Sequence, residues 1–257
     1  MESDLLLSFE SLVEGLWLSM RVAGLWIALP VFGSAVLPAR QRLLLTIATT
    51  VLLVLALDGR VDIPEPGTPA FYFSAAMELV VGLLLGFAMR LAFEAMLLSA
   101  ELISLAMGLG FAQMNDPLRG TSAPVLGSLF SVITTLVFLS LDGHLRMMEW
   151  LAWSYLSVPV SGASLAGVLV ENMLSWSGWF FVHAVQVAMP ALIALLIVNI
   201  GFGVISRSAP ALNLLAIGFP AALLLGLLVL AVMSPIIVEQ AGLAISQALM
   251  WVREMVG

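Results

Sequence analysis

Long apolar runs alternate with short polar stretches along the chain, and this pattern predicts a set of membrane-type helices. A helix that crosses a bilayer needs about 20 predominantly apolar residues, so some of the runs are short for this purpose and one is far too long. The main runs cover residues 16–37, 43–57, 71–112, 125–141, 147–160, 179–205 and 211–238. We predict an all-α membrane-type protein of helical hairpins with six to eight crossings.

The longest run, residues 71–112, contains no proline and only four charged residues, Glu78, Arg90, Glu94 and Glu101. A single helix of this length would measure about 63 Å at ~1.5 Å per residue, twice the ~30 Å of the hydrocarbon core. The run is therefore either two crossings that fold back near Arg90 or one long helix that projects from the membrane inside a protein assembly.

Three charges of this run form a polar stripe. On an ideal helix Arg90, Glu94 and Glu101 fall within an arc of about 40°. Each charge costs about 2.5 to 3.5 kcal/mol at the bilayer centre, so we expect the stripe to face protein or water. Two interpretations stay open: the three residues satisfy one another and neighbouring subunits, or they form a proton or ion relay in a secondary transporter.

The long run breaks at a segment that is not helical in pattern, Gly-Leu-Gly-Phe-Ala-Gln-Met-Asn-Asp-Pro-Leu-Arg-Gly, residues 108–120. Irregular backbone persists at membrane depth only where protein or a water-filled cavity covers it. We therefore expect an irregular mid-chain loop that is surrounded by protein.

Several shorter signals place turns and contacts. Pro30 should bend or end the first helix, residues 58–69 read as a loop, and residues 142–144 (Asp-Gly-His) read as a turn. Residues 239–257 predict an amphipathic helix that lies against a partner or the membrane surface.

Two further groups concern packing. Gly82 and Gly86 form a Gly-x-x-x-Gly pair that allows two helix backbones to approach closely. The aromatic residues Trp150, Trp153 and Tyr155 suit an interfacial belt or a subunit contact.

A tight turn at residues 206–210, which contains Arg207 and Pro210, joins two late runs. Asn199 and Asn213 flank this turn and could bond its backbone. A buried asparagine in such a place more often holds helices in register than binds a substrate, so we expect a packing role.

Composition agrees with a membrane protein and excludes several functions. The 257 residues are 62% hydrophobic and 10% charged with a mean hydropathy of +1.14, whereas soluble domains carry about 25% charged residues. The net charge of -7 argues against nucleic acid, and the lack of cysteine with two distant histidines argues against a metal site. No catalytic motif is present, so we expect a single domain over residues 1–257 that needs no cofactor and is not an enzyme.

Three stretches of the sequence are distinctive. They are Gly-Leu-Gly-Phe-Ala-Gln-Met-Asn-Asp-Pro from residue 108, Leu-Ser-Leu-Asp-Gly-His from residue 139, and Ser-Arg-Ser-Ala-Pro-Ala-Leu-Asn-Leu-Leu-Ala-Ile-Gly-Phe-Pro from residue 206. Together they resemble the FliR family, the export-gate subunit of flagellar type III secretion that is called SctT in injectisomes. The last stretch is the most specific, although Ala211 stands where the family usually has glutamine. The resemblance covers nearly the whole chain.

The resemblance implies a non-enzymatic subunit of a helical hetero-oligomer in the bacterial inner membrane and flagellar basal body, with part of the assembly above the bilayer. FliR-like proteins assemble with FliP-like and FliQ-like subunits, contact an FlhB-like subunit, and let unfolded flagellar proteins pass. The Asn-Asp-Pro loop favours the flagellar system over the injectisome.

The resemblance also implies a channel plug, in which the loop matching residues 109–122 projects into the channel. Phe111 and Met114 would be its apolar stoppers, and residues 115–117 the turn that shapes it. The implied plug residues are Leu109, Gly110, Phe111, Met114, Asn115, Asp116 and Pro117.

Overall fold

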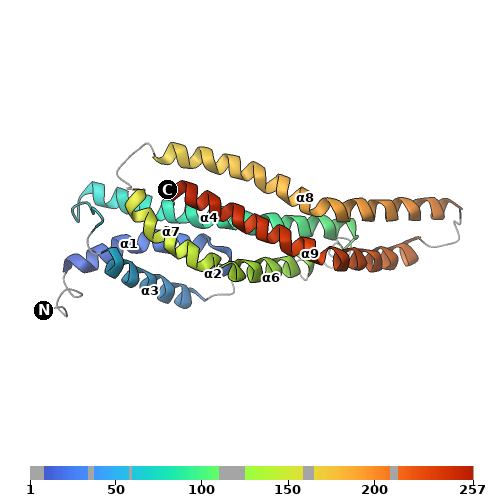
Figure 1. Cartoon of the computed structure of the whole chain (residues 1–257), viewed down its shortest axis with the longest axis horizontal. Coiled ribbons are helices and arrows are strands. Elements are labelled where there is room, and N and C mark those ends of the chain that lie inside the picture. Colours follow the sequence, from blue (N-terminus) through green and yellow to red (C-terminus); the bar gives the residue numbers. More distant parts are fainter. Residues whose placement is uncertain are drawn as a thin grey trace. The chain divides into compact units, whose positions relative to one another are not determined.

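The computed structural model describes residues 9–33, 38–57, 60–109, 125–158, 165–208 and 214–256. These residues form helices and their connections, and none of them lies in a strand (Figure 1). The helices are α1 (Phe9–Ala28), α2 (Pro30–Gly33), α3 (Ala39–Leu57), α4 (Pro69–Ala106), α6 (Val125–Ser140), α7 (Gly143–Ser157), α8 (Leu165–Ser208) and α9 (Leu214–Val256). The all-α prediction is confirmed.

The chain divides into two compact units. The first unit comprises residues 1–91, 142–177 and 246–257, and the second comprises residues 92–141 and 178–245. Helices α4, α8 and α9 contribute residues to both units.

Helix α4 is one continuous helix of 38 residues, so the interpretation with two crossings folded back near Arg90 is wrong. It measures about 57 Å at ~1.5 Å per residue, which exceeds the ~30 Å of a hydrocarbon core. Nothing in residues 69–106 terminates a helix: there is no internal proline, and Gly82 and Gly86 each cost only about 1 kcal/mol relative to alanine.

Within the described ranges, four helices are long and apolar enough to cross a membrane, or five if α6 and α7 together make one span. The described residues therefore offer fewer membrane-capable helices than the six to eight predicted crossings. Helix α8 has 44 residues and joins the stretch before Trp176 to the run after it, because Gly178 alone does not end a helix. The proposed tail helix at 239–257 is likewise not separate, because it continues α9.

The turn and loop predictions agree with the structure in several places. Helix α1 ends at Ala28 and α2 begins at Pro30, which is the position that proline tolerates best in a helix. Asp142, between α6 and α7, adopts a left-handed backbone with φ 53°.

Pro190 lies inside α8, and Pro220 and Pro235 lie inside α9, so proline does not terminate these helices.

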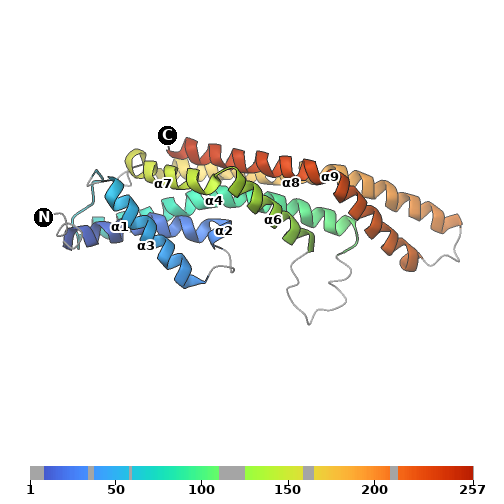
Figure 2. The same cartoon turned by 60° about the horizontal axis from the view of Figure 1, so that its bottom comes forward.

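In the first unit, α1 packs against α3 and α4 (Figures 1 and 2). The approach of α1 to α4 is very close at Gly82, where an added Cβ would collide with the backbone carbonyl of Arg21. At Gly86 an added Cβ would lie 2.6 Å from the Ala28 Cβ and 2.8 Å from the Leu25 carbonyl oxygen. The Gly-x-x-x-Gly pair therefore forms a helix contact, as predicted.

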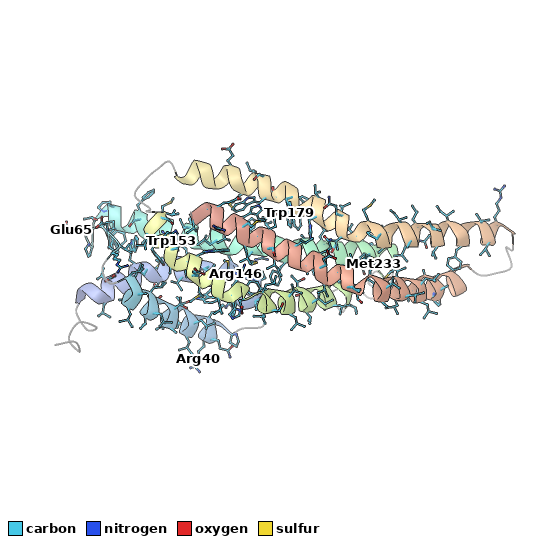
Figure 3. The ribbon with its side chains drawn as sticks, viewed as in Figure 1. Arg40, Glu65, Arg146, Trp153, Trp179 and Met233 are labelled. Carbon is cyan, nitrogen blue, oxygen red and sulfur yellow. The ribbon has the colours of Figure 1, made fainter. Side chains whose placement is uncertain are left out.

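In the second unit, side chains from α4, α6, α8 and α9 form one apolar core. Its buried members include Ile103 and Met107 near the end of α4, Phe130 on α6, Ala191 on α8 and Met233 on α9, which Figure 3 labels. Leu109 and Leu126, which precede and follow residues 110–124, pack into the same core.

Substituting Gly82 by alanine should destabilise the protein, although alanine favours helices by about 1 kcal/mol, because the new methyl group overpacks the contact between α1 and α4 at a cost of about 1 to 3 kcal/mol. Thermal unfolding of the solubilised chain measures the effect. The matched control is Gly201→Ala on α8, where an added Cβ would meet no described atom within 4 Å. Equal melting temperatures for the two variants would show that Gly82 is not a close contact.

Candidate functional site

A buried ion pair joins α1 to α4 in the first unit. The Nε of Arg21 donates to Oε2 of Glu78, and its Nη2 donates to Oε1 at 2.9 Å, so the pair is bidentate. Arg21 is 1% exposed and Glu78 is 0% exposed. Planar guanidinium and carboxylate groups match in this geometry, which adds directionality to the charge attraction.

The remaining contacts of Arg21 come from helix α7 and the residue that follows it. Nη1 of Arg21 donates to the Ser154 hydroxyl at 2.8 Å, and Nη2 donates to the Val158 carbonyl at 3.1 Å. The guanidinium carbon lies 4.4 Å from the centroid of the Tyr155 ring, and the Tyr155 hydroxyl donates to the Leu18 carbonyl at 2.6 Å.

We call Arg21, Glu78, Ser154 and Tyr155 the Arg21 clamp. A second tie between α1 and α4 lies nearby, where the Trp17 indole donates to the Ser74 hydroxyl at 3.0 Å. The Arg21 guanidinium is buried and is paired with a carboxylate, a hydroxyl and a carbonyl. We therefore interpret the clamp as a structural contact that holds three helices together and not as a group that exchanges protons with solvent.

Sequence reasoning missed the clamp. It assigned no partner to Arg21 and placed Tyr155 in an interfacial belt or subunit contact. Tyr155 is instead buried inside its own chain. A usable signal existed, because Arg21 and Glu78 are isolated opposite charges in two apolar runs, and such charges tend to pair inside membrane proteins.

The predicted stripe of Arg90, Glu94 and Glu101 lies on α4, as expected from their spacing. Arg90 is exposed, and Glu94 and Glu101 are half-buried. The fully buried acidic group of α4 is Glu78, which lies outside the stripe.

The end of α4 is a second feature of interest. Gly108 adopts φ 78°, its N–H donates to the Leu105 carbonyl at 3.0 Å, and the Leu109 N–H donates to the Ser104 carbonyl at 3.1 Å. This is a Schellman termination, in which glycine takes the left-handed position and the following apolar residue packs back on the helix. The predicted break therefore begins at a defined helix stop.

Leu109 is half-buried against the second unit's core. The other plug residues, Gly110, Phe111, Met114 and residues 115–117, lie outside the described residues, as do Pro210 and Asn213.

Of the predicted helix-turn residues that are described, Asn199 and Arg207 are both exposed on α8. Helix α8 extends to Ser208, so the connection starts later than the predicted turn at residue 206.

Among the described residues, no group of three or more histidine, aspartate or glutamate side chains could hold a metal ion.

The described residues thus define a helical protein with four or five membrane-capable helices, a buried ion pair and a long helix that stops abruptly in mid-chain. Comparison with protein families then gives a match to bacterial export proteins, family 1, over residues 12–248. The chain belongs to this family, which is the FliR family of export proteins, so the resemblance stated from the sequence is confirmed.

Characterised relatives support the assignment. The chain is 31% identical over 225 residues to the flagellar biosynthetic protein FliR of Pectobacterium carotovorum subsp. carotovorum, covering 86% of this chain and 84% of the relative. It is 30% identical over 221 residues to FliR of Escherichia coli (strain K12), with the same coverage. It is 31% identical over 234 residues to FliR of Aquifex aeolicus (strain VF5), covering 91% and 90%.

Removing one residue of the Arg21–Glu78 ion pair should lower the stability of the protein much more than removing both. Arg21→Met leaves the Glu78 carboxylate buried without its counter-charge, which costs about 3 to 5 kcal/mol, whereas Arg21→Met with Glu78→Leu should recover much of the loss. The readout is thermal unfolding of the solubilised chain. Arg40→Met, at the exposed start of α3, serves as the control (Figure 3). If Arg21→Met and Arg40→Met have the same melting temperature, the clamp does not stabilise the protein.

Proposed function

We propose that this chain is a non-enzymatic gating subunit of the flagellar protein export channel in the bacterial inner membrane. In this role it assembles with FliP-like and FliQ-like subunits, contacts an FlhB-like subunit, and lets unfolded flagellar proteins pass. Membership of the export family supports this proposal, and the names of the relatives favour the flagellar system.

The main support for the gating role is the Schellman termination of α4, together with the packing of the residues on both sides of the loop that follows it. Met107 and Leu109 on one side of residues 110–124, and Leu126 on the other, all pack in one apolar core. The residues at both ends of this segment are therefore anchored in the same core. A plug requires such anchoring, because its loop can then be displaced while its ends stay fixed.

In this proposal the plug consists of residues 109–122. Phe111 and Met114 close the channel by apolar contact, residues 115–117 shape the turn, and an incoming unfolded chain displaces the loop. A methionine suits such a seal, because its side chain is flexible and fills irregular gaps.

The exposed apolar faces of the long helices support a hetero-oligomer. Helix α3 exposes Leu43, Leu44 and Leu52 at 60% or more, and α8 exposes Ile197 at 66%. Helix α8 measures about 66 Å at ~1.5 Å per residue, so one bilayer does not cover it. Neighbouring subunits would cover what lipid does not.

The alternative function is a proton- or ion-coupled transporter with Arg90, Glu94 and Glu101 as its relay. The length of α4 and α8 gives no support to a lone transporter, because helices twice the thickness of the hydrocarbon core need other protein around them. We therefore assign the stripe to contacts that stabilise the assembly.

Replacing residues 110–122 by a flexible Gly/Ser segment should make cells leak small solutes while protein export continues. The replacement keeps Leu109 and Leu126 in the core, so the fold should survive. Uptake of a small dye or ion conductance measures the leak, and secretion of a flagellar protein measures export. Leu136→Ala, on the exposed face of α6, is the control. A cell that stays sealed after the replacement argues against the plug.

Charge reversal at Glu94 or Glu101 should reduce recovery of the assembled complex before it changes conductance, because both side chains are half-buried on α4. Co-purification with the neighbouring subunits and proton-dependent export are measured on the same cells, with Glu239→Lys on α9 as the comparison. A complex of normal yield that has lost proton-dependent export would instead favour the relay.

A further inference from the structure

The first unit contains a cavity of about 890 Å³ that neither the plug nor the clamp explains. Its walls come from the end of α3 with the following residue Arg60, from the second half of α7, and from the last turns of α9. Its volume lies in the range of about 300 to 1,000 Å³ that is usual for small-molecule sites.

Four charged residues line the cavity, two of each sign: Arg60 and Arg253, Glu149 and Glu254. All four are exposed. Within the described part of the chain, their side chains make no hydrogen bond or ion pair with one another or with other residues. The charges are thus available to a ligand and sum to zero.

The remaining walls are aromatic and apolar. Trp150 and Trp153 come from α7, with Trp153 56% exposed (Figure 3). Leu57, Leu156 and Met250 contribute aliphatic surface, and the last two are also exposed. The cavity therefore combines a charged part with an oily part.

The cavity lies where two membrane-capable helices end. The candidate spans Ala39–Leu57 and Pro220–Val256 both finish there, and their last residues line it. Tryptophan and arginine side chains gather at the headgroup level of a bilayer, so a wall with Trp150, Trp153 and two arginines suits a molecule of that interface.

We propose that this cavity binds one phospholipid whose headgroup carries both a phosphate and a primary ammonium. Arg60 and Arg253 hold the phosphate, Glu149 and Glu254 accept hydrogen bonds from the ammonium, and the acyl chains leave over Leu156 and Met250. A headgroup with only a phosphate would meet two uncompensated carboxylates, and an apolar protein segment would leave all four charges desolvated and unpaired. A zwitterionic aminophospholipid satisfies both parts.

Native mass spectrometry of the full-length, delipidated chain tests the proposal, with phosphatidylethanolamine, phosphatidylcholine and phosphatidylglycerol as probes. One phosphatidylethanolamine should be retained. Arg60→Gln with Arg253→Gln should weaken its retention by about tenfold, as expected for the loss of two exposed charge-assisted hydrogen bonds. Arg40→Gln with Arg146→Gln removes two exposed arginines from α3 and α7 outside the cavity and should change nothing (Figure 3).

The carboxylates provide a second, independent readout. Glu149→Gln with Glu254→Gln should shift the preference toward phosphatidylglycerol, because the repulsion of a purely anionic headgroup is removed. Equal retention of all three lipids by the wild-type chain, or equal loss in both arginine pairs, would overturn the proposal.

The assembled complex supplies the last test. A photo-crosslinking residue at Leu156, introduced in cells that make the whole export complex, should capture phospholipid. Capture of a neighbouring protein subunit at this position would show that a protein, and not a lipid, fills the cavity.

Discussion

The ion pair between Arg21 and Glu78 is the interaction on which the packing of the first unit depends. Taking two charges out of water costs several kcal/mol for each ion, and the cost is recovered only if geometry and hydrogen bonding are nearly complete. Here Glu78, Ser154 and the Val158 carbonyl meet the guanidinium, and they come from α4, from α7 and from the residue after α7. Moving α4 away from α1 would leave the buried charge of Arg21 without its counter-charge.

The same stretch of α1 also fixes the distance between backbones. The Arg21 carbonyl lies against Gly82, one turn along α4 from Glu78, so side-chain charge and backbone contact specify the same register. In the second unit, the corresponding constraint is the apolar core that holds Met107, Leu109 and Leu126.

Local signals allowed much of the fold to be predicted. The apolar runs located the helices, Pro30 located the start of α2, and Gly108 located the stop of α4, since each acts through neighbours a few residues away. Long-range geometry was harder to predict. Opposite charges in apolar runs indicate that Arg21 and Glu78 could pair, but they do not show which helices meet, because the clamp joins residues 57 and 133 positions apart and the cavity gathers three separate segments. The continuity of α8 and α9 was missed because the predicted runs began at residue 179 and ended at residue 238, where polar side chains interrupt the apolar pattern but do not interrupt the helix.

We propose that other export subunits cover most of the apolar faces of this chain. Native mass spectrometry of the gently solubilised protein, expressed beside its neighbouring membrane genes, is the most direct test. We expect recovery in a large heteromeric particle with FliP-like and FliQ-like partners. A monomer or homodimer that transports a solute in liposomes would contradict it.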